Sequence, residues 1–253
     1  MFEICLKEDD FSIQVFFKNY SVIFTKKEAG NFSFQQQNFP IEITSKARIE
    51  FSKKYNIFPK NVFNPILEHD KNYYVANKSL NIEYHNIDSQ IGNGDAILVI
   101  EKDLYGMITF ADCIPLALLC INKNACASIH LGSKSIIKDV TSFLLKEWHE
   151  RYDLNPSKWL AIIGPSIFYK DYEVQLDFIE FIKKANIELL NFIYNFNGKY
   201  YFDNRSALLF QLKKYGVENI FTLDFNTYED IRFSSYRKEK PNHITQALFV
   251  TFS

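Results

Sequence analysis

The stretch GMITFADCIPLALLCINKNACASIHLGSKS occupies positions 106–135, near the middle of the chain. It contains three apolar runs, Met107–Phe110, Ile114–Ile121 and Ala125–Ile129. The runs are short, rich in Ile, Leu, Phe and Ala, and bounded by Gly, Pro and Asn, which favours buried strands over helices. Cys113 follows the first run and His130 follows the third. Both are therefore expected where strand gives way to loop, where a rigid frame can hold reactive side chains.

The rest of the chain is predicted to add further strands and several helices. The additional strands are predicted at Phe11–Phe17, Ser21–Phe24, Val62–Leu67, Tyr73–Val75, Leu80–Tyr84, Ala96–Ile100, Trp159–Ile163, Tyr200–Phe202, Ile220–Leu223 and Ile244–Phe252. The helices are predicted at Glu42–Tyr55, Ser133–Tyr152 with Ser133 as its cap, Gln175–Ala185, Ile187–Asn195 and Asn204–Tyr215. Because strands and helices do not alternate regularly, the pattern indicates an α+β fold.

The composition is that of an ordinary globular protein. Hydrophobic residues make up 47% of the 253 residues and charged residues 23%. No repeat or linker divides the chain, so a single domain over residues 1–253 is expected. The formal net charge is −1 without a basic block, which argues against a nucleic-acid partner. No apolar run reaches membrane-spanning length, and the acidic start MFEICLKEDD does not fit a signal peptide, so a cytoplasmic protein with reduced cysteines is expected.

The histidines and cysteines offer one candidate metal site. The five histidines are His69, His85, His130, His149 and His243. Only His69 and His130 end apolar runs; the others are interpreted as ordinary surface or strand-flanking residues. Together with Cys113 they would form a two-imidazole, one-thiolate site with an open fourth position, as in catalytic zinc centres. The alternative is that Cys113 is a small buried hydrophobe.

Other polar residues have both a functional and a structural interpretation. Asp112 could orient a ligand or carry a proton, or it could bond to nearby backbone. Ser166 lies in Gly164-Pro165-Ser166-Ile167, which is either an anion-binding turn or an ordinary one. A basic cluster that includes Tyr236 and Arg237 could receive phosphate or a carboxylate, or could be a solvated loop.

Five short motifs, in order, resemble the laccase-domain family. They are Ala-Asp-Cys-x-Pro (111–115), His-x-Gly (130–132), Gly-Pro-x-Ile (164–167), Tyr-Glu-Val (172–174) and Phe-x-Ser-Tyr-Arg (233–237). This family is also described as multicopper polyphenol oxidase-like, as peptidoglycan editing factor, or as purine nucleoside phosphorylase. The resemblance runs from His69 to the C-terminus.

The resemblance implies a single α+β domain, a mixed β half-barrel or sandwich flanked by helices. It also implies zinc ligands at His69, Cys113 and His130, and phosphorolysis of purine nucleosides with adenosine deamination alongside. Zinc can activate water for attack on the purine carbon that bears the amino group, and a cation can bind phosphate for attack on the ribose. Asp112 would assist proton transfer, and Lys134 with Arg237 would serve the anion.

The sequence also departs from the family pattern. The family's His-Ala-Gly-Trp-Arg-Gly segment is here His130-Leu-Gly-Ser-Lys134-Ser, so a lysine replaces the arginine and loses its bidentate fork. The family's Gln-Val-His-Gly segment is here Leu67-Glu-His-Asp70. A later Cys-Thr-Tyr-Cys segment is here Asn226-Thr-Tyr-Glu229. The metal ligands are retained, while the residues expected to face the substrate have changed.

Several functions therefore remain open on the sequence. The first is a zinc-dependent enzyme acting on purine nucleosides and phosphate. A second is hydrolytic editing of a peptidoglycan precursor, with the metal or the Cys113 thiolate as nucleophile. A third is a non-catalytic binding protein that retains zinc. A multicopper oxidase is disfavoured because it needs many imidazole ligands, and the chain has five histidines.

Overall fold

The computed structural model describes residues 3–36, 38–78 and 90–253. The strand predicted at Leu80–Tyr84 and His85 lie outside these residues. Within them the strands form three sheets, and most of the predicted strands are present within one or two residues of their expected ends. The central stretch gives three strands, as expected: β8 (Tyr105–Phe110), β9 (Ile114–Cys120) and β10 (Cys126–Leu131).

The first large sheet has the described order β1-β2-β3-β16-β8-β4-β6. Besides β8, its strands are β1 (Cys5–Glu8), β2 (Ser12–Phe17), β3 (Tyr20–Thr25), β16 (Gln246–Phe252), β4 (Val62–Ile66) and β6 (Gln90–Asn93). The second has the described order β15-β11-β9-β10-β7-β5. Its other strands are β15 (Asn219–Thr222), β11 (Trp159–Ile163), β7 (Ala96–Val99) and β5 (Tyr73–Ala76). A small sheet pairs β12 (Glu173–Val174), β14 (Lys199–Phe202) and β13 (Ile193–Phe196).

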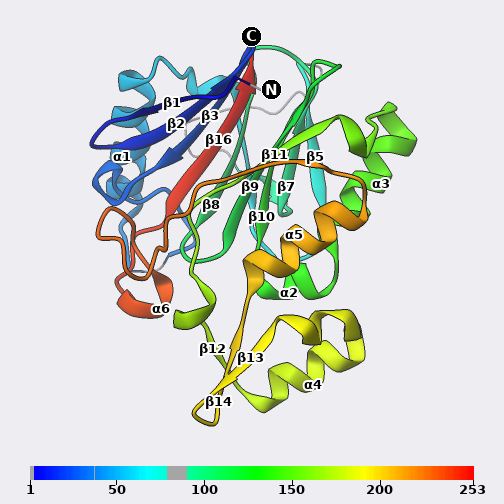
Figure 1. Cartoon of the computed structure of the whole chain (residues 1–253). Coiled ribbons are helices and arrows are strands. Elements are labelled where there is room, and N and C mark those ends of the chain that lie inside the picture. Colours follow the sequence, from blue (N-terminus) through cyan, green and yellow to red (C-terminus); the bar gives the residue numbers. More distant parts are fainter. Residues whose placement is uncertain (1–2, 37, 79–89) are drawn as a thin grey trace.

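The two large sheets form a sandwich with helices on both outer faces (Figure 1). Their shared interior takes Phe24 and Ile108 from the first sheet and Ile97 and Ile162 from the second. Phe51 of α1 packs on the outer face of the first sheet. Helices α3 and α5 cover the second sheet. The helices are α1 (Ile41–Lys54), α2 (Ser133–Ile137), α3 (Val140–Tyr152), α4 (Leu176–Ala185), α5 (Asn204–Lys214) and α6 (Tyr236–Glu239), with short 3₁₀ turns at Lys27–Ala29, Pro59–Asn61, Pro156–Lys158, Tyr169–Asp171 and Ile187–Phe192.

This arrangement confirms the α+β class and the sandwich flanked by helices. The described strands close no barrel. Several chain segments pass from one sheet to the other at the same end of the sandwich. Residues 67–72 join β4 to β5, residues 94–95 join β6 to β7, residues 111–113 join β8 to β9, and residues 223–245 join β15 to β16. The first of these segments carries His69 and the third carries Cys113.

The helix predicted at Ser133–Tyr152 is interrupted. It divides into α2 and α3 because Asp139 adopts a left-handed conformation with φ of 53°. Asp tolerates that region better than most residues, and its carboxylate accepts a bond from the Ser142 hydroxyl at 2.5 Å. Gly132, and not Ser133, is the capping residue of α2. The apolar face was correctly predicted, since Ile136, Val140 and other members of it are buried.

The prediction of a helix at Ile187–Asn195 was wrong. A 3₁₀ turn over Ile187–Phe192 leads instead into β13, which pairs with β14 as a hairpin. Asn197 and Gly198 both have positive φ, the conformation of a two-residue Asn-Gly hairpin turn. The Asn-Gly pair was visible in the sequence, but the apolar spacing before it also fitted a helix.

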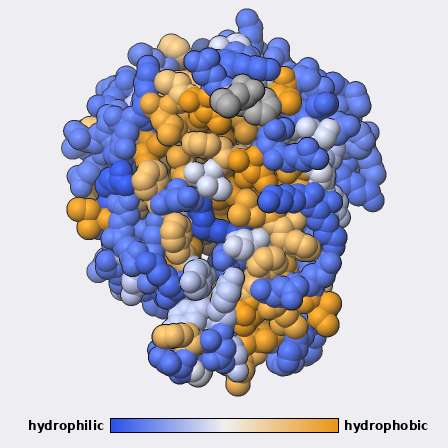
Figure 2. Space-filling model, in the orientation of Figure 1, coloured by the Kyte–Doolittle hydropathy of each residue, from blue (hydrophilic) through white to orange (hydrophobic). Residues whose placement is uncertain are grey.

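The surface is of the ordinary globular kind. Figure 2 shows hydrophilic residues around the periphery of one face and apolar residues toward its middle. Among the helices of the described ranges, none combines the length and apolar character needed to cross a bilayer.

Candidate metal centre and cavity

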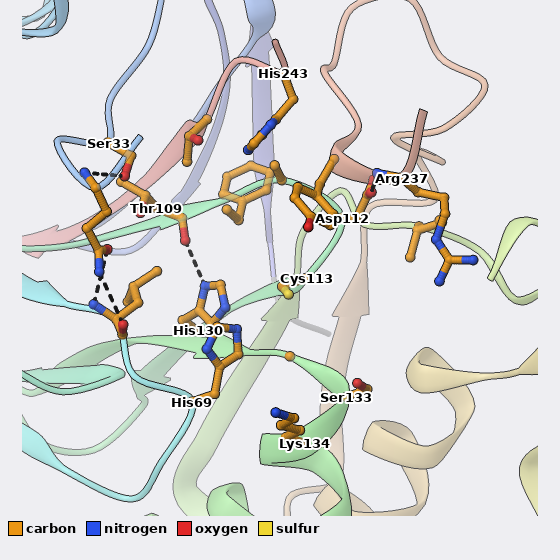
Figure 3. Close-up of a pocket in the computed structure, with 18 of the residues that line it drawn as sticks. Ser33, His69, Thr109, Asp112, Cys113, His130, Ser133, Lys134, Arg237 and His243 are labelled. Atoms are coloured by element: carbon orange, nitrogen blue, oxygen red, sulfur yellow. Dashed lines mark hydrogen bonds between the residues drawn. The ribbon is translucent and has the colours of Figure 1, made fainter. Parts of the chain in front are cut away.

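Three side chains from separate elements meet at the end of the sandwich (Figure 3). His69 follows β4, Cys113 lies in the crossing between β8 and β9, and His130 lies near the end of β10. One nitrogen or sulfur atom of each lies within 4.8 Å of the others. The centroids of the two imidazole rings are 5.0 Å apart, and the rings are perpendicular. The structure thus brings together the three residues that the sequence proposed as ligands, and this cluster could bind a metal.

His130 has the protonation state that a metal ligand needs. Its Nδ1 lies 2.7 Å from the carbonyl oxygen of Thr109, so Nδ1 carries the proton and donates it. Nε2 is then a lone-pair acceptor, and it is buried without a partner among the described residues. Burial, with a smaller effect of nearby His69, lowers the pKa of His130 to about 3. A neutral, oriented imidazole with an unpaired nitrogen fits metal coordination.

Gly132 provides the space in which the cluster sits. A Cβ atom built on this glycine would lie 2.6 Å from Cδ2 of His69 and 3.3 Å from Sγ of Cys113. The backbone of Gly132 is extended, with φ of −75°, so glycine is required here for space and not for conformation. Gly132 is therefore part of the site.

The surroundings of Cys113 disfavour a free thiolate. Burial, followed by the charges of Asp112 and Asp95, raises its pKa to about 12. A nucleophilic cysteine usually has a lowered pKa next to a cation. A metal that binds here would displace the thiol proton, since the ligand form is the thiolate.

Asp112 is used to hold another loop in place. Its backbone has φ of 78°, and its carboxylate is buried. Oδ1 accepts a bond from the Thr227 hydroxyl at 2.6 Å. Oδ2 accepts from the Ser235 hydroxyl at 2.9 Å and from the Arg237 backbone N–H at 2.6 Å. Burial raises the pKa of Asp112, and these donors oppose that rise. The carboxylate of Asp112 therefore anchors the loop at 227–237 to the crossing between β8 and β9.

We expect Asp112→Ala to lower the free energy of unfolding by about 3 kcal/mol, because it leaves two buried hydroxyls and the partly buried Arg237 N–H without their acceptor. Asp112→Asn keeps an acceptor oxygen, so it should lower the free energy of unfolding by less. Urea denaturation followed by circular dichroism measures both. Unchanged stability together with lost activity would contradict the anchoring role and favour proton transfer.

The cluster opens into a cavity of about 780 Å³. Lys134, Tyr236 and Arg237, which the sequence analysis proposed for anion binding, are among the residues that line it. In Figure 3, Arg237 and Lys134 lie on different sides of Cys113. The Arg237 guanidinium stacks 4.8 Å from the Tyr172 ring centroid and donates to the Glu173 carbonyl at 2.9 Å.

Ser166 is not among the residues that line the cavity. It is fully buried, and its hydroxyl accepts a bond from Arg205 at 2.9 Å. Arg205 also bonds to the carbonyls of Gly164 and Leu223, which ties this turn to the end of β15. Its neighbour Ile167 lines the cavity instead. The turn is structural, and the interpretation of Ser166 as an anion ligand finds no support in this geometry.

Sequence reasoning missed other cavity residues. His243 was interpreted as strand-flanking, but it lines the cavity, with its ring perpendicular to that of Tyr236 at 5.0 Å. Gln36 donates to its Nε2 at 2.6 Å, which leaves Nδ1 unpaired among the described residues. Tyr172 and Asn204 also line the cavity. Tyr172 had a signal in the Tyr-Glu-Val motif; His243 had none, because its neighbours are distant in sequence.

The two carboxylates next to His69 have other partners. Glu68 accepts a bond from the side chain of Asn72 at 2.5 Å. Asp70 forms an ion pair with Lys138 at 3.3 Å, and this lysine holds the pKa of Asp70 below its usual range. Neither carboxylate has a bond to a ligand of the cluster among the contacts of the described residues.

Curated relatives are named as purine nucleoside phosphorylases. One, from Campylobacter jejuni subsp. jejuni serotype O:2, is 26% identical over 199 residues, which cover 75% of this chain and 84% of the relative. Another, YlmD of Bacillus subtilis, is 35% identical over 92 residues, which cover 36% of this chain and 32% of that protein. A third, from Aquifex aeolicus, is 28% identical over 153 residues, which cover 60% of this chain and 68% of the relative.

Solved structures share the whole fold. A Bacillus licheniformis hypothetical protein, YfiH, superposes with a TM-score of 0.87 at 16% identity and covers 98% of this chain and 99% of its own. YlmD from Geobacillus stearothermophilus superposes with a TM-score of 0.86 at 15% identity, and the superposition covers 99% of each chain. The sequence model of one family matches residues 20–252. The chain therefore belongs to the family described as multi-copper polyphenol oxidoreductase laccase, as its motifs suggested.

Proposed function

We propose that this protein is a zinc-dependent enzyme that cleaves purine nucleosides with phosphate and also deaminates adenosine. The observation that carries the proposal is the buried Nε2 of His130, which has no partner among the described residues and lies with His69 and Cys113 at a cavity that Lys134 and Arg237 also line. The names of the relatives supply the substrate class. A cavity of about 780 Å³ has room for a nucleoside and phosphate together.

The donor set favours zinc over the copper of the family description. Two imidazoles and one thiolate match catalytic zinc sites, where a fourth position stays open. The same three donors also occur in single-copper electron-transfer sites, but oxidation of phenols by dioxygen requires several copper ions and many more imidazoles. The whole chain has five histidines. When bound, zinc would supply Lewis acidity next to the cavity.

The chain's own side chains suit the two ends of such a substrate. Lys134 and Arg237 offer positive charge for phosphate. Tyr236 and His243 offer aromatic surface and a ring nitrogen for a planar base. In phosphorolysis a phosphate oxygen bonds to the ribose C1′, the bond from C1′ to the base nitrogen breaks, and that nitrogen gains a proton. In deamination water replaces the amino group, which leaves as ammonia.

Lys134→Met is expected to raise the KM for phosphate by about tenfold, because one charge-assisted hydrogen bond from an exposed cation is lost. The KM for the nucleoside should change much less. Lys138→Met is the matched control: this lysine also lines the cavity, but Asp70 already neutralises it. Initial rates at varied phosphate measure the effect. An equal phosphate KM in the Lys134 variant and the parent protein would exclude this lysine from the phosphate site.

The activity itself is tested by incubating zinc-loaded protein with adenosine, with and without phosphate, and separating the products. Adenine and ribose 1-phosphate that appear only with phosphate identify phosphorolysis, while inosine in both conditions identifies deamination. If a folded, zinc-loaded sample gives no adenine, inosine or hypoxanthine, the proposal is wrong for adenosine. The non-catalytic zinc-binding reading would then replace it.

A further inference from the structure

Asp95 occupies a buried position between the two histidines of the cluster. It lies in the two-residue crossing from β6 in the first sheet to β7 in the second, and none of its surface is exposed. Its own backbone N–H donates to the Asn72 carbonyl at 2.9 Å. The preceding Gly94 donates to the Ile66 carbonyl at 2.9 Å. The crossing is therefore attached on both sides to the loop that carries His69.

The carboxylate of Asp95 holds that loop directly. Its Oδ2 accepts the backbone N–H of Asp70 at 2.8 Å and that of Glu68 at 3.4 Å. These two residues flank His69. A buried carboxylate that accepts backbone N–H groups is a strong anchor, because hydrogen bonds to a charged acceptor are stronger than those between neutral groups.

The same residue is also bonded to the second histidine. The backbone carbonyl of Asp95 accepts the N–H of His130 at 2.7 Å. One residue thus links the loop of His69 to the strand of His130. Distances between the ligand atoms of the two histidines depend on this link, since β4 and β10 belong to different sheets.

His69 needs such an anchor because its backbone is in an unfavourable conformation. Its φ is 60°, in the left-handed region that residues other than glycine rarely adopt. That conformation costs about 1 kcal/mol or more and persists only where surrounding contacts enforce it. Without the carboxylate, the loop would relax toward ordinary backbone angles, and the imidazole would move with it.

We propose that Asp95 is a positioning residue for the metal centre: its carboxylate holds the Glu68–Asp70 loop so that His69 reaches the metal beside Cys113 and His130. The inference rests on the metal-binding half of the proposed function and not on the nucleoside chemistry. A protein that binds zinc but turns over no nucleoside would leave it intact.

The test is the zinc affinity of metal-free protein, measured by competition with a chromophoric chelator. We expect Asp95→Ala to weaken zinc binding by about 10- to 100-fold, the usual effect of losing a partner that orients a metal ligand. Asp95→Asn keeps an acceptor oxygen, so its zinc affinity should stay within about twofold of that of the parent protein. A difference of this size is no larger than the scatter expected between independent effects. Asp95→Asn also serves as the test if the alanine variant does not fold, since a tenfold loss in a folded Asn variant would assign the effect to charge and overturn the proposal.

Asp9→Ala is the matched control. Asp9 also accepts two backbone N–H groups, those of Phe11 and Ser12, at 2.8 and 2.9 Å, but it does not line the cavity. Its loss should lower the melting temperature and leave zinc affinity unchanged. A role of Asp95 in stability alone would give the same result for Asp95→Ala, and that result would contradict the proposal.

A double-mutant cycle separates positioning from direct electrostatics. In a His69→Ala background, Asp95→Ala should cause no further loss of zinc affinity, because the ligand that it positions is gone. If the full loss persists without His69, the carboxylate acts on the metal or on Cys113 through its charge, and the positioning role is wrong.

Discussion

Cys113→Ala is expected to lose bound zinc and to lower adenosine turnover by about 1000-fold, which corresponds to about 4 kcal/mol of transition-state stabilisation. Cys113 supplies the only thiolate of the cluster formed by the described residues. Two imidazoles alone bind zinc far less tightly than two imidazoles and a thiolate. Metal analysis of the purified variant and product chromatography measure the two effects.

Cys126→Ala is the control for this variant. Cys126 is a free, buried cysteine on β10, the strand that carries His130, but it is not part of the cluster. Its replacement should cost some stability and retain zinc and turnover. Full zinc content and full activity in Cys113→Ala would refute the site. Activity that survives complete removal of zinc from the parent protein would instead indicate a thiol mechanism.

Gly132→Ala is expected to weaken zinc binding by about 100-fold without disturbing the backbone. The added methyl group would lie 2.6 Å from Cδ2 of His69 and 3.2 Å from its Nε2, so the imidazole must move away. Overpacking of this severity costs about 3 kcal/mol, which gives roughly this loss of affinity. Alanine adopts the extended angles of this position readily, so the effect is steric.

The adjacent Ser133→Ala is the control. The Ser133 hydroxyl bonds to Tyr172 and is not a ligand of the cluster, so its removal should leave zinc affinity within about twofold. Chelator competition measures both variants. Parental zinc affinity in a folded Gly132→Ala protein would mean that His69 does not coordinate the metal in the position seen here.

The sequence predicted much of the frame because its apolar runs are short and clearly bounded. The strands that flank Cys113 and the strand that carries His130 were predicted from the apolar runs around positions 107–131. The break at Asp139 could not be predicted in the same way, since a single residue in the left-handed region interrupts an apolar face that continues through it. The hairpin at Asn197-Gly198 was missed because the preceding residues fit a helix as well as a strand.

The cavity was less predictable than the cluster, because its residues come from elements distant in the sequence. Ser166 looked like an anion ligand in a Gly-Pro turn, but Arg205, which folds back from α5, occupies its hydroxyl. His243 looked unremarkable because its partners, Gln36 and Tyr236, are set by tertiary packing. Asp95 was not selected from the sequence, because only the packing of the two sheets shows what its carboxylate holds.

We propose that one metal held by His69, Cys113 and His130 supports nucleoside chemistry in the adjoining cavity. The most direct measurement is adenosine turnover during a titration of metal-free protein with zinc, with occupancy and products determined in the same samples. We expect turnover to rise in proportion to occupancy and to level off at one zinc per chain. Equal turnover in metal-free and zinc-loaded protein, or no turnover at full occupancy, would contradict the claim.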